Sequence, residues 1–384
     1  MLAQRPVALV EKCFDRYVEF LCRLCSFETK AYYKDEIDRM VDYIAEFARG
    51  EGFTVTRIPF ENCGDFLTIE INENAEKGGV LLAHMDTVHE KGAFGDTPVT
   101  VHADRIVGPG TIDCKGGIAV AMLAMKALLD SGYDRHLRLL LTSDEEISNK
   151  LGGAKERAFF SEKVVGFPCA LNCEVAENNE VVISRKGIIK YRVDIRGVSG
   201  HSGIHYFSCS NPVLEAAKKI VDLQNKSEEG GITYSCNIVN GGVLENIIPE
   251  TCSFSVDIRV PTQEHMRIAQ EEIRKTVEKS FVSGTSATLT KLSERPPMEK
   301  NDRTQELFNR LQSVSQAYGL GELTAVESGG GSDSCYTQQA GVTSICGLGP
   351  CGEFCHTNRE YVLTETIARR AKLLAAFFVE EGKQ

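Results

Sequence analysis

The chain has 384 residues, a length that usually accommodates two domains. Its composition is that of an ordinary globular protein, with 42% hydrophobic residues, 25% charged residues and a net charge of −11. This acidic balance predicts no basic face for a nucleic acid, and no apolar run is long enough to cross a membrane. We therefore expect neither a nucleic acid nor a membrane as a partner.

The fourteen cysteines predict thiols rather than disulfides. A chain of this length does not need disulfides to hold its core. The pairs Cys22–Cys25 and Cys351–Cys355 each lack a second pair at zinc-finger spacing. The N-terminal sequence has no apolar signal-peptide segment. We therefore expect a cytoplasmic protein with reduced cysteines.

The first half of the chain predicts strands that alternate with helices. Apolar residues recur at helical spacing in some segments and alternate as in strands in others. The predicted helices are 6–28, 34–51 and 116–129, and the predicted strands are 53–59, 66–71, 80–83 and 137–142. This alternation indicates an α/β sheet with helices on both faces, and the run Val80–Ala83 is typical of its buried centre.

The pattern changes near Ser184. The strands expected beyond it are 187–196, 234–239, 251–260 and 287–293, and the helices are 211–225 and 263–281. Their order, β-α-β-β-α-β, is typical of a ferredoxin-like domain. Helix–strand alternation resumes after Pro296 and Pro297. We therefore expect residues 185–297 to form a domain inserted into a first domain of residues 1–184 and 298–384.

Side chains with metal-binding chemistry follow several of the predicted strands. His84 and Asp86 end the Val80 strand, and residues two apart on a strand point to the same side. Further candidates follow later predicted strands or precede helices: Asp113, Glu145, Glu146, Glu174 and His356. Each has a common structural role as an alternative, such as a core histidine, a helix cap or a solvated acid.

The positions of these residues favour a site. Open α/β sheets place their sites at the carboxyl ends of strands, which is where most of these residues fall. Two histidines with three or four carboxylates suit a pair of Zn²⁺ ions, for which Co²⁺ or Mn²⁺ could substitute.

Nine short motifs occur in the order and spacing of a known family. They are HMDT at 84–87, GPGTIDCKGG at 108–117, TSDEE at 142–146, CE at 173–174, GHSG at 200–203, NIIP at 246–249, DIR at 257–259, GGGSD at 329–333 and CHTNREYV at 355–362. On these motifs the chain resembles the dizinc aminoacylase and carboxypeptidase G-type metallopeptidases, which include acetylornithine deacetylase, succinyl-diaminopimelate desuccinylase and peptidase T. The resemblance covers essentially the whole chain. It implies a zinc-exopeptidase-like catalytic domain with an inserted ferredoxin-like α+β domain that serves as lid and dimerisation domain.

The resemblance also implies a role for each matching metal-site residue. His84 and Glu174 would hold one zinc ion, Glu146 and His356 the other, and Asp113 would bridge both. Asp86 would support His84, and the Asp113–Cys114 peptide would be cis. Two zinc ions that share a water lower its pKa towards neutrality. Glu145 would then act as general base and pass the proton to the leaving amine.

Further matching positions concern the substrate. In dimeric relatives the equivalent of His201 comes from the other subunit, where it steadies the oxyanion. Asn246 and Arg259 match positions that bind a substrate carboxylate, which suits a bidentate guanidinium. Gly330 would line the pocket. Relatives commonly carry an Arg just before this glycine run, whereas this chain has Glu327 there. We hypothesise that Glu327 changes the charge preference, in favour of a substrate amine.

The leading prediction is a homodimeric zinc hydrolase that cleaves an amide bond of a small peptide or an N-acyl amino acid, as a carboxypeptidase, dipeptidase or deacylase does. A peptidase T-like aminopeptidase is the alternative within the class. A cysteine hydrolase is a second class, because Cys114, Cys173 and Cys355 lie beside candidate ligands. A non-catalytic binding protein on the same fold is the third.

Overall fold

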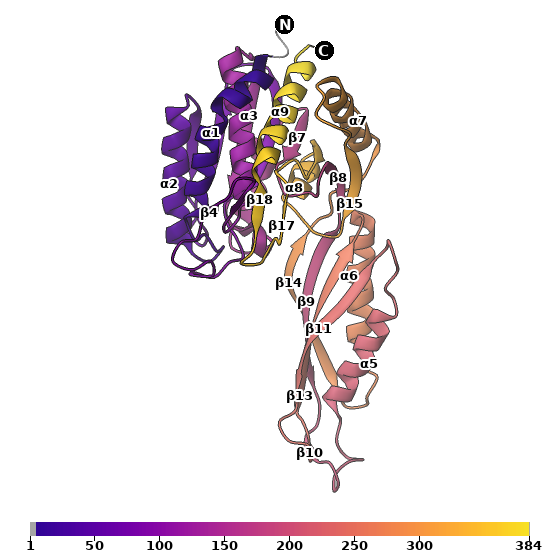
Figure 1. Cartoon of the computed structure of the whole chain (residues 1–384). Coiled ribbons are helices and arrows are strands. Elements are labelled where there is room, and N and C mark those ends of the chain that lie inside the picture. The colour runs from indigo at the N-terminus through magenta and orange to yellow at the C-terminus, as the bar shows by residue number, and fades with distance from the viewer. Residues whose placement is uncertain (1–4, 384) are drawn as a thin grey trace. The chain divides into compact units, whose positions relative to one another are not determined.

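The computed structural model describes residues 5–383 and divides the chain into two compact units (Figure 1). The second unit consists of Arg185–Glu299 together with Ser328–Gly331, and the first unit contains the rest. The inserted segment therefore ends two residues beyond the expected 297, and a short stretch from the glycine run is grouped with it. The two units are described separately below.

The first unit is built on a mixed sheet whose centre is the strand predicted around Val80. The strand order is β1 (Thr54–Ile58), β2 (Phe66–Ile71), β6 (His136–Thr142), β3 (Lys77–His84), β7 (Cys169–Asn172) and β16 (Thr343–Ile345). β3 is parallel to β6 and β7, whereas β1 and β2 form the antiparallel edge. The α/β prediction for this unit is confirmed.

Helices cover both faces of this sheet. They are α1 (Arg5–Cys25), α2 (Lys34–Gly50), α3 (Lys115–Ser131), α4 (Gly153–Lys163), α7 (Asp302–Ala317), α8 (Ser334–Gln339) and α9 (Thr364–Glu381). α3 is apolar on nearly all sides because it lies on β3 and β6 and is packed by α1 and α9 (Figure 1). The opposite face is covered in part by α4, where Phe159 contacts Phe66. In the part of the chain that the structure describes, no helix is both long enough and apolar enough to span a membrane.

Alternation along the strands divides the buried residues between the two faces. Leu81 and Ala83 of β3 join the large cluster that includes α1, α3 and α9. Gly79 of the same strand is required there, since a Cβ at this position would lie 2.4 Å from Phe378 Cε1 of α9. The close approach of α9 to the sheet thus depends on a missing side chain.

Short strands complete the first unit. A four-stranded sheet has the order β17 (Gly352–Glu353), β18 (Tyr361–Leu363), β5 (Arg105–Val107) and β4 (Thr100–Val101). β8 (Glu180–Arg185) pairs with β15 (Thr324–Ser328). A single 3-10 turn, η1 (Glu145–Ile147), follows β6. The β5–β18 pairing brings the segment before Asp113 next to the segment after His356.

The second unit has the predicted ferredoxin-like order. Its antiparallel sheet runs β11 (Thr233–Gly241), β13 (Thr251–Val260), β9 (Gly187–Arg196) and β14 (Ser286–Arg295). α5 (Pro212–Gln224) and α6 (Gln263–Glu278) pack on this sheet and enclose a separate core. Gly200 and His201, which lie outside the predicted strands, form a short strand β10 that pairs with β12 (Ile247–Ile248). The paired residues are 48 and 46 positions apart in the sequence, a separation that a local pattern cannot reveal.

Candidate metal centre

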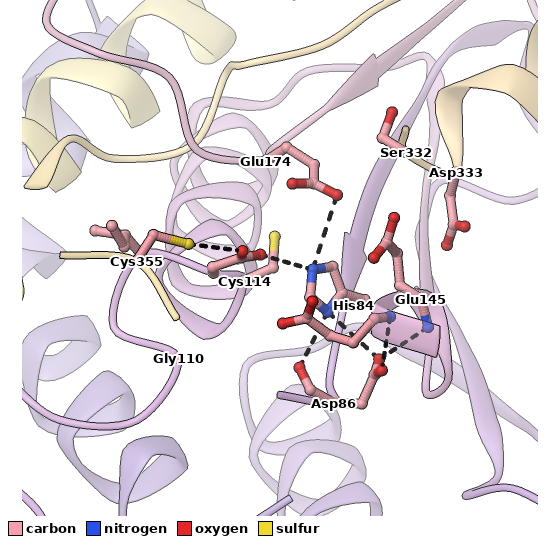
Figure 2. Close-up of polar contacts among 12 residues, drawn as sticks. His84, Asp86, Gly110, Cys114, Glu145, Glu174, Ser332, Asp333 and Cys355 are labelled. Atoms are coloured by element: carbon pink, nitrogen blue, oxygen red, sulfur yellow. Dashed lines mark hydrogen bonds and ion pairs between the residues drawn. The ribbon is translucent and has the colours of Figure 1, made fainter. Parts of the chain in front are cut away.

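The predicted metal-binding side chains meet at one edge of the first unit's sheet (Figure 2). Because β3, β6 and β7 are parallel, their carboxyl ends lie at the same edge. His84 is the last residue of β3, Glu145 and Glu146 begin η1 just after β6, and Glu174 lies two residues beyond β7. Topology alone therefore gathers residues that are 90 positions apart in the chain.

Asp113 lies at the middle of the cluster. Its Oδ1 is 2.9 Å from His84 Nε2, and its Oδ2 is 3.1 Å from His356 Nε2. His84 Nε2 is also 3.7 Å from Glu174 Oε1, and His356 Nε2 is 3.3 Å from Glu146 Oε2. The two oxygens of one carboxylate thus face two separate groups, each with one histidine and one glutamate.

Asp86 connects the end of β3 to the turn that carries the two glutamates. Its carboxylate accepts the backbone N–H of Glu145 at 3.2 Å and that of Glu146 at 3.0 Å. His84 Nδ1 lies 3.0 Å from the backbone carbonyl of Asp86 and 3.4 Å from its Oδ1. The expected support of His84 therefore comes at closest range from the main chain, while the carboxylate mainly orients η1.

The charges in this cluster favour a cation. Burial would raise the pKa of Asp113, but hydrogen bonds from His356 and His84 outweigh it and hold that pKa well below its usual range. Burial, together with the charge of Asp113, raises the pKa of Glu146 well above its usual range. Oε1 of Glu146 is buried and has no hydrogen-bond partner among the described residues. A bound cation would neutralise the carboxylates and give that oxygen a partner, so these residues fit a metal centre.

The sequence matches the model of the peptidase family M20/M25/M40 over residues 80–380. The chain belongs to this family. It is 25% identical over 372 residues to carboxypeptidase G2 of Pseudomonas sp. (strain RS-16), covering 95% of this chain and 89% of that protein. The peptidases and amidohydrolases of family M20 use a dinuclear metal centre, so the chain is a metal-dependent hydrolase.

Solved structures agree with this M20 fold. The aminopeptidase PepT from Bacillus cereus superposes with a TM-score of 0.79 at 18% identity, covering 96% of this chain and 98% of that one. The YXEP protein of Bacillus subtilis, a dinuclear metal-binding peptidase of family M20, superposes with a TM-score of 0.71 at 14% identity over 96% and 98% of the two chains. The mixed sheet and the separate antiparallel sheet are therefore those of M20 enzymes.

Three backbone features of this M20 chain shape the centre. The Asp113–Cys114 peptide is cis, as the resemblance implies. Gly117 lets α3 approach the neighbouring loop, because a Cβ there would lie 2.0 Å from the carbonyl oxygen of Cys173, next to Glu174. His356 has a φ of +64°, which is rare for a residue with a side chain.

Glu360 is a residue of the site that the sequence analysis did not single out. It is fully buried, and its Oε1 accepts the backbone N–H of Ile112 at 2.9 Å and that of Asp113 at 3.2 Å. Its Oε2 lies 2.8 Å from His89 Nε2 and accepts the N–H of Gly110 at 3.3 Å. Glu360 lies four residues after His356 in the CHTNREYV motif, and this position is the one sequence feature that could have identified it.

Two further polar residues stabilise the loops. Lys115, from the DCKGG motif, is fully buried and donates to the carbonyl of Phe27 at 2.8 Å, and burial lowers the pKa of its amine to about 8. Asp333, from the GGGSD motif, accepts the hydroxyl of Thr142 at 2.7 Å and the amide of Asn149 at 3.0 Å. Both motifs were noted in the sequence, but nothing local marked these two side chains as buried.

The cysteine-hydrolase alternative finds no support. Burial raises the pKa of the Cys114 and Cys173 thiols, and Cys114 donates to the carbonyl of Cys173 at 3.2 Å. Burial also raises the pKa of Cys355, whose thiol donates to Asp113. A nucleophilic cysteine needs the opposite, a lowered pKa.

The remaining predicted residues are four in the second unit and Glu327 in the first. His201 in β10 accepts the N–H of Gly203 at 3.1 Å, and Asn246 is exposed just before β12. Arg259 pairs with Asp257 at 2.6 Å and donates to the carbonyl of Gly329 at 3.3 Å. These residues belong to the second unit, as does Gly330. Glu327 in β15 of the first unit is 63% exposed and pairs with Lys300 at 3.2 Å.

Proposed function

We propose that this M20 enzyme is a zinc hydrolase that cleaves an amide bond of a small peptide or an N-acyl amino acid. The observation that carries the proposal is the Asp113 carboxylate, whose two oxygens face His84 with Glu174 on one side and His356 with Glu146 on the other. Such a carboxylate suits the bridging position between two metal ions.

The residues present would hold the two metal ions as follows. His84 and Glu174 would bind one ion, Glu146 and His356 the other, and Asp113 both. The ions, when bound, would polarise the scissile carbonyl and lower the pKa of the attacking water. Nitrogen and oxygen donors suit Zn²⁺, and Co²⁺ or Mn²⁺ are expected to substitute.

Glu145 would move the proton. It would accept a proton from the attacking water and deliver it to the leaving amine nitrogen, so that the amide becomes an acid and a free amine. The residue is 7% exposed, and its backbone N–H donates to the Asp86 carboxylate, which keeps the residue in a defined orientation. Water exclusion around a buried base strengthens its interaction with the charges that develop.

The substrate would be recognised by residues of the second unit. We propose that Asn246, Arg259 and Gly330 bind the carboxylate end of the substrate and that His201 donates a hydrogen bond to the oxyanion. Carboxypeptidase G2 as a relative favours carboxypeptidase action, and the likeness to PepT keeps aminopeptidase action as the alternative.

We further propose a homodimer formed through the second unit, in which His201 serves the partner's site. Exposed apolar side chains support an interface: Phe207 is 98% exposed, Val243 91% and Ile204 73%. A cytoplasmic location is also proposed. It is supported by the absence of disulfides among the described cysteines, which suits a reducing compartment.

The test is hydrolysis of a mixed panel of dipeptides, tripeptides and N-acetyl or N-succinyl amino acids by the metal-loaded enzyme. We expect one product class, lost after treatment with EDTA and restored by Zn²⁺. Release from the carboxyl end, from the amino end or of an acyl group identifies the type of hydrolase. Activity that survives EDTA would overturn the metal-dependent proposal.

A further inference from the structure

Cys355 carries a soft donor atom that faces the central carboxylate of the metal centre. Its Sγ lies 3.0 Å from Asp113 Oδ2, the same oxygen that lies 3.1 Å from His356 Nε2. The dashed line that leaves the Cys355 sulfur in Figure 2 marks this contact. Sγ, Nε2 and a carboxylate oxygen of Asp113 all lie within 4.8 Å of one another, which is the spacing of a metal-ligand group.

We propose that Cys355 is a sulfur ligand of the metal ion held by Asp113, Glu146 and His356, and that it makes this position selective for thiophilic cations. The proposal rests on the proposed function, since it concerns the same centre. It adds a ligand to that centre and assigns the class of cation, namely Zn²⁺ in preference to Mn²⁺ or Mg²⁺. The thiol hydrogen that now points to Asp113 Oδ2 would be replaced by the metal ion.

The backbone supports the convergence of two neighbouring side chains. Adjacent residues in extended chain point in opposite directions, so both rarely reach one ion. Here Phe354 and His356 have φ values of +62° and +64°, on either side of Cys355. These left-handed conformations are unfavourable for residues with side chains and persist where the surrounding structure demands them. Their result is that Sγ and Nε2 both approach Asp113 Oδ2.

The distances on this side are at or just below those between the ligands of a tetrahedral ion. Zinc bonds of about 2.3 Å to sulfur and about 2.0–2.1 Å to nitrogen place neighbouring ligand atoms roughly 3.3–3.8 Å apart. The observed separations are 3.0 Å from Sγ to Oδ2, 3.1 Å from Nε2 to Oδ2 and 3.3 Å from Nε2 to Glu146 Oε2. Small outward movements would open the space for the ion.

An independent observation on the same side points to a cation. Glu146 Oε1 is buried and has no hydrogen-bond partner among the described residues, although the carboxylate sits beside Asp113. With Cys355 the group on this side would supply four protein donors, whereas His84, Glu174 and Asp113 supply three. The two ions would therefore differ in coordination and in affinity, and the three-donor position would keep the more open place for the attacking water.

The consequence of a sulfur donor is selectivity. Thiolate ligands favour zinc and related soft ions, whereas centres made only of carboxylates, histidine and water also accept manganese. Removal of Cys355 should therefore weaken zinc far more than manganese. The change should be at least the roughly 10–100-fold that loss of an outer partner of a metal ligand costs.

The test uses the full-length protein freed of metal and reloaded with Co²⁺. We compare the wild type with Cys355→Ser and Cys355→Ala, and with Cys22→Ser as the matched control, because Cys22 is a partly exposed cysteine of α1. We expect a near-ultraviolet sulfur-to-cobalt absorption band in the wild type and in Cys22→Ser that is lost in both Cys355 variants. Elemental analysis gives the number of ions per chain, and competition between Zn²⁺ and Mn²⁺ gives the selectivity.

The outcomes separate the two proposals. Two ions per wild-type chain without the sulfur band, or an equal band in Cys355→Ser, would overturn the sulfur ligand and leave the dinuclear hydrolase intact. A wild type that binds no metal would overturn both proposals. A second measurement is alkylation of the wild type followed by mass spectrometry. We expect Zn²⁺ to protect Cys355 but not Cys22, and equal labelling of Cys355 with and without Zn²⁺ would contradict ligation.

Discussion

Most candidate functional residues of the first unit are buried and hydrogen-bonded, whereas those of the second unit are largely exposed. In the first unit His84 is 1% exposed and Asp86 is fully buried, and each has a defined hydrogen-bond partner. In the second unit His201 and Asn246 are exposed, and Arg259 is bonded to its own strand neighbour Asp257. Buried charges must be paired, because an unpaired one costs several kcal/mol, whereas exposed ones stay free to exchange partners. The side chains of the metal centre are thus preorganised, whereas those proposed to bind the substrate are exposed or paired within their own strand.

The largest effects are expected from two adjacent residues of the first unit, Glu145 and Glu146, which have different proposed roles. We expect Glu145→Gln to lower turnover about 10²–10⁴-fold with metal content unchanged, because it removes the base and keeps the ligands. Glu146→Gln should lose one of the two metal ions as well as activity. Activity and elemental analysis of both variants provide the measurement. Loss of metal in Glu145→Gln with retention in Glu146→Gln would exchange the two roles.

In the second unit, the loss of His201 should lower catalysis without lowering stability. His201→Ala should reduce turnover about 10²–10³-fold, the usual cost of a lost oxyanion donor. Melting temperature and metal content should not change, since the side chain is exposed and bonds to Gly203 of its own turn. The control is His205→Ala, an exposed histidine on the same segment. Equal activity of the two variants would remove His201 from the mechanism.

Glu360 tests whether the buried network sets metal affinity. Glu360→Gln should lower metal affinity about 10–100-fold, because the loop that carries Asp113 loses its anchor. It should also lower the free energy of unfolding by about 2–4 kcal/mol, because an N–H left without an acceptor costs about 1–3 kcal/mol. Isothermal titration and urea unfolding measure both. The control is Glu353→Gln, an exposed residue of β17 in the short four-stranded sheet, and similar losses there would contradict a specific role.

Glu156 offers a pH test in the first unit. Burial, together with the charge of Asp144, raises the pKa of Glu156 well above its usual range. Oε2 of Glu156 is buried and has no donor among the described residues, but a protonated Glu156 can itself donate a hydrogen bond to Asp144. A raised pKa contributes stability that is fully present below the unfolded value near 4.3 and is lost as pH rises towards the folded pKa. Glu156→Gln should therefore be more stable than the wild type at pH 7–8, with the difference shrinking as pH falls towards 4. Unfolding curves across this range measure it, and a variant that is less stable at pH 8 would contradict the protonated form.

The smallest effect is expected at Glu327. Its pair with Lys300 is exposed, so Glu327→Arg should change the free energy of unfolding by less than about 1 kcal/mol. If Glu327 favours a substrate amine, the variant should shift the preference in the substrate panel towards carboxylate-bearing substrates. Glu322→Arg, an exposed acid on the same segment, is the control. An unchanged preference would remove Glu327 from the specificity argument.

Much of the fold could be predicted because its signals are local. The alternation in 66–71, 187–196 and 251–260 predicts the bounds of β2, β9 and β13 as the structure has them. The uniformly apolar run around Val80 identified the central strand, since only a strand covered on both faces tolerates such a sequence. The β10–β12 pair around His201 was missed, because its two partners are far apart in sequence.

The sequence by itself determined which residues could do chemistry: the HxD at 84–86, the acid pair at 145–146 and the late His356 specify donor atoms, and their order specifies the family. Only the tertiary structure decided how these atoms meet. The parallel arrangement of β3, β6 and β7 brings their ends together, the buried Glu360 holds the Asp113 loop, and two left-handed residues turn Cys355 and His356 to one oxygen. The physical reason is that donor chemistry resides in single side chains, whereas burial and convergence depend on contacts between distant segments.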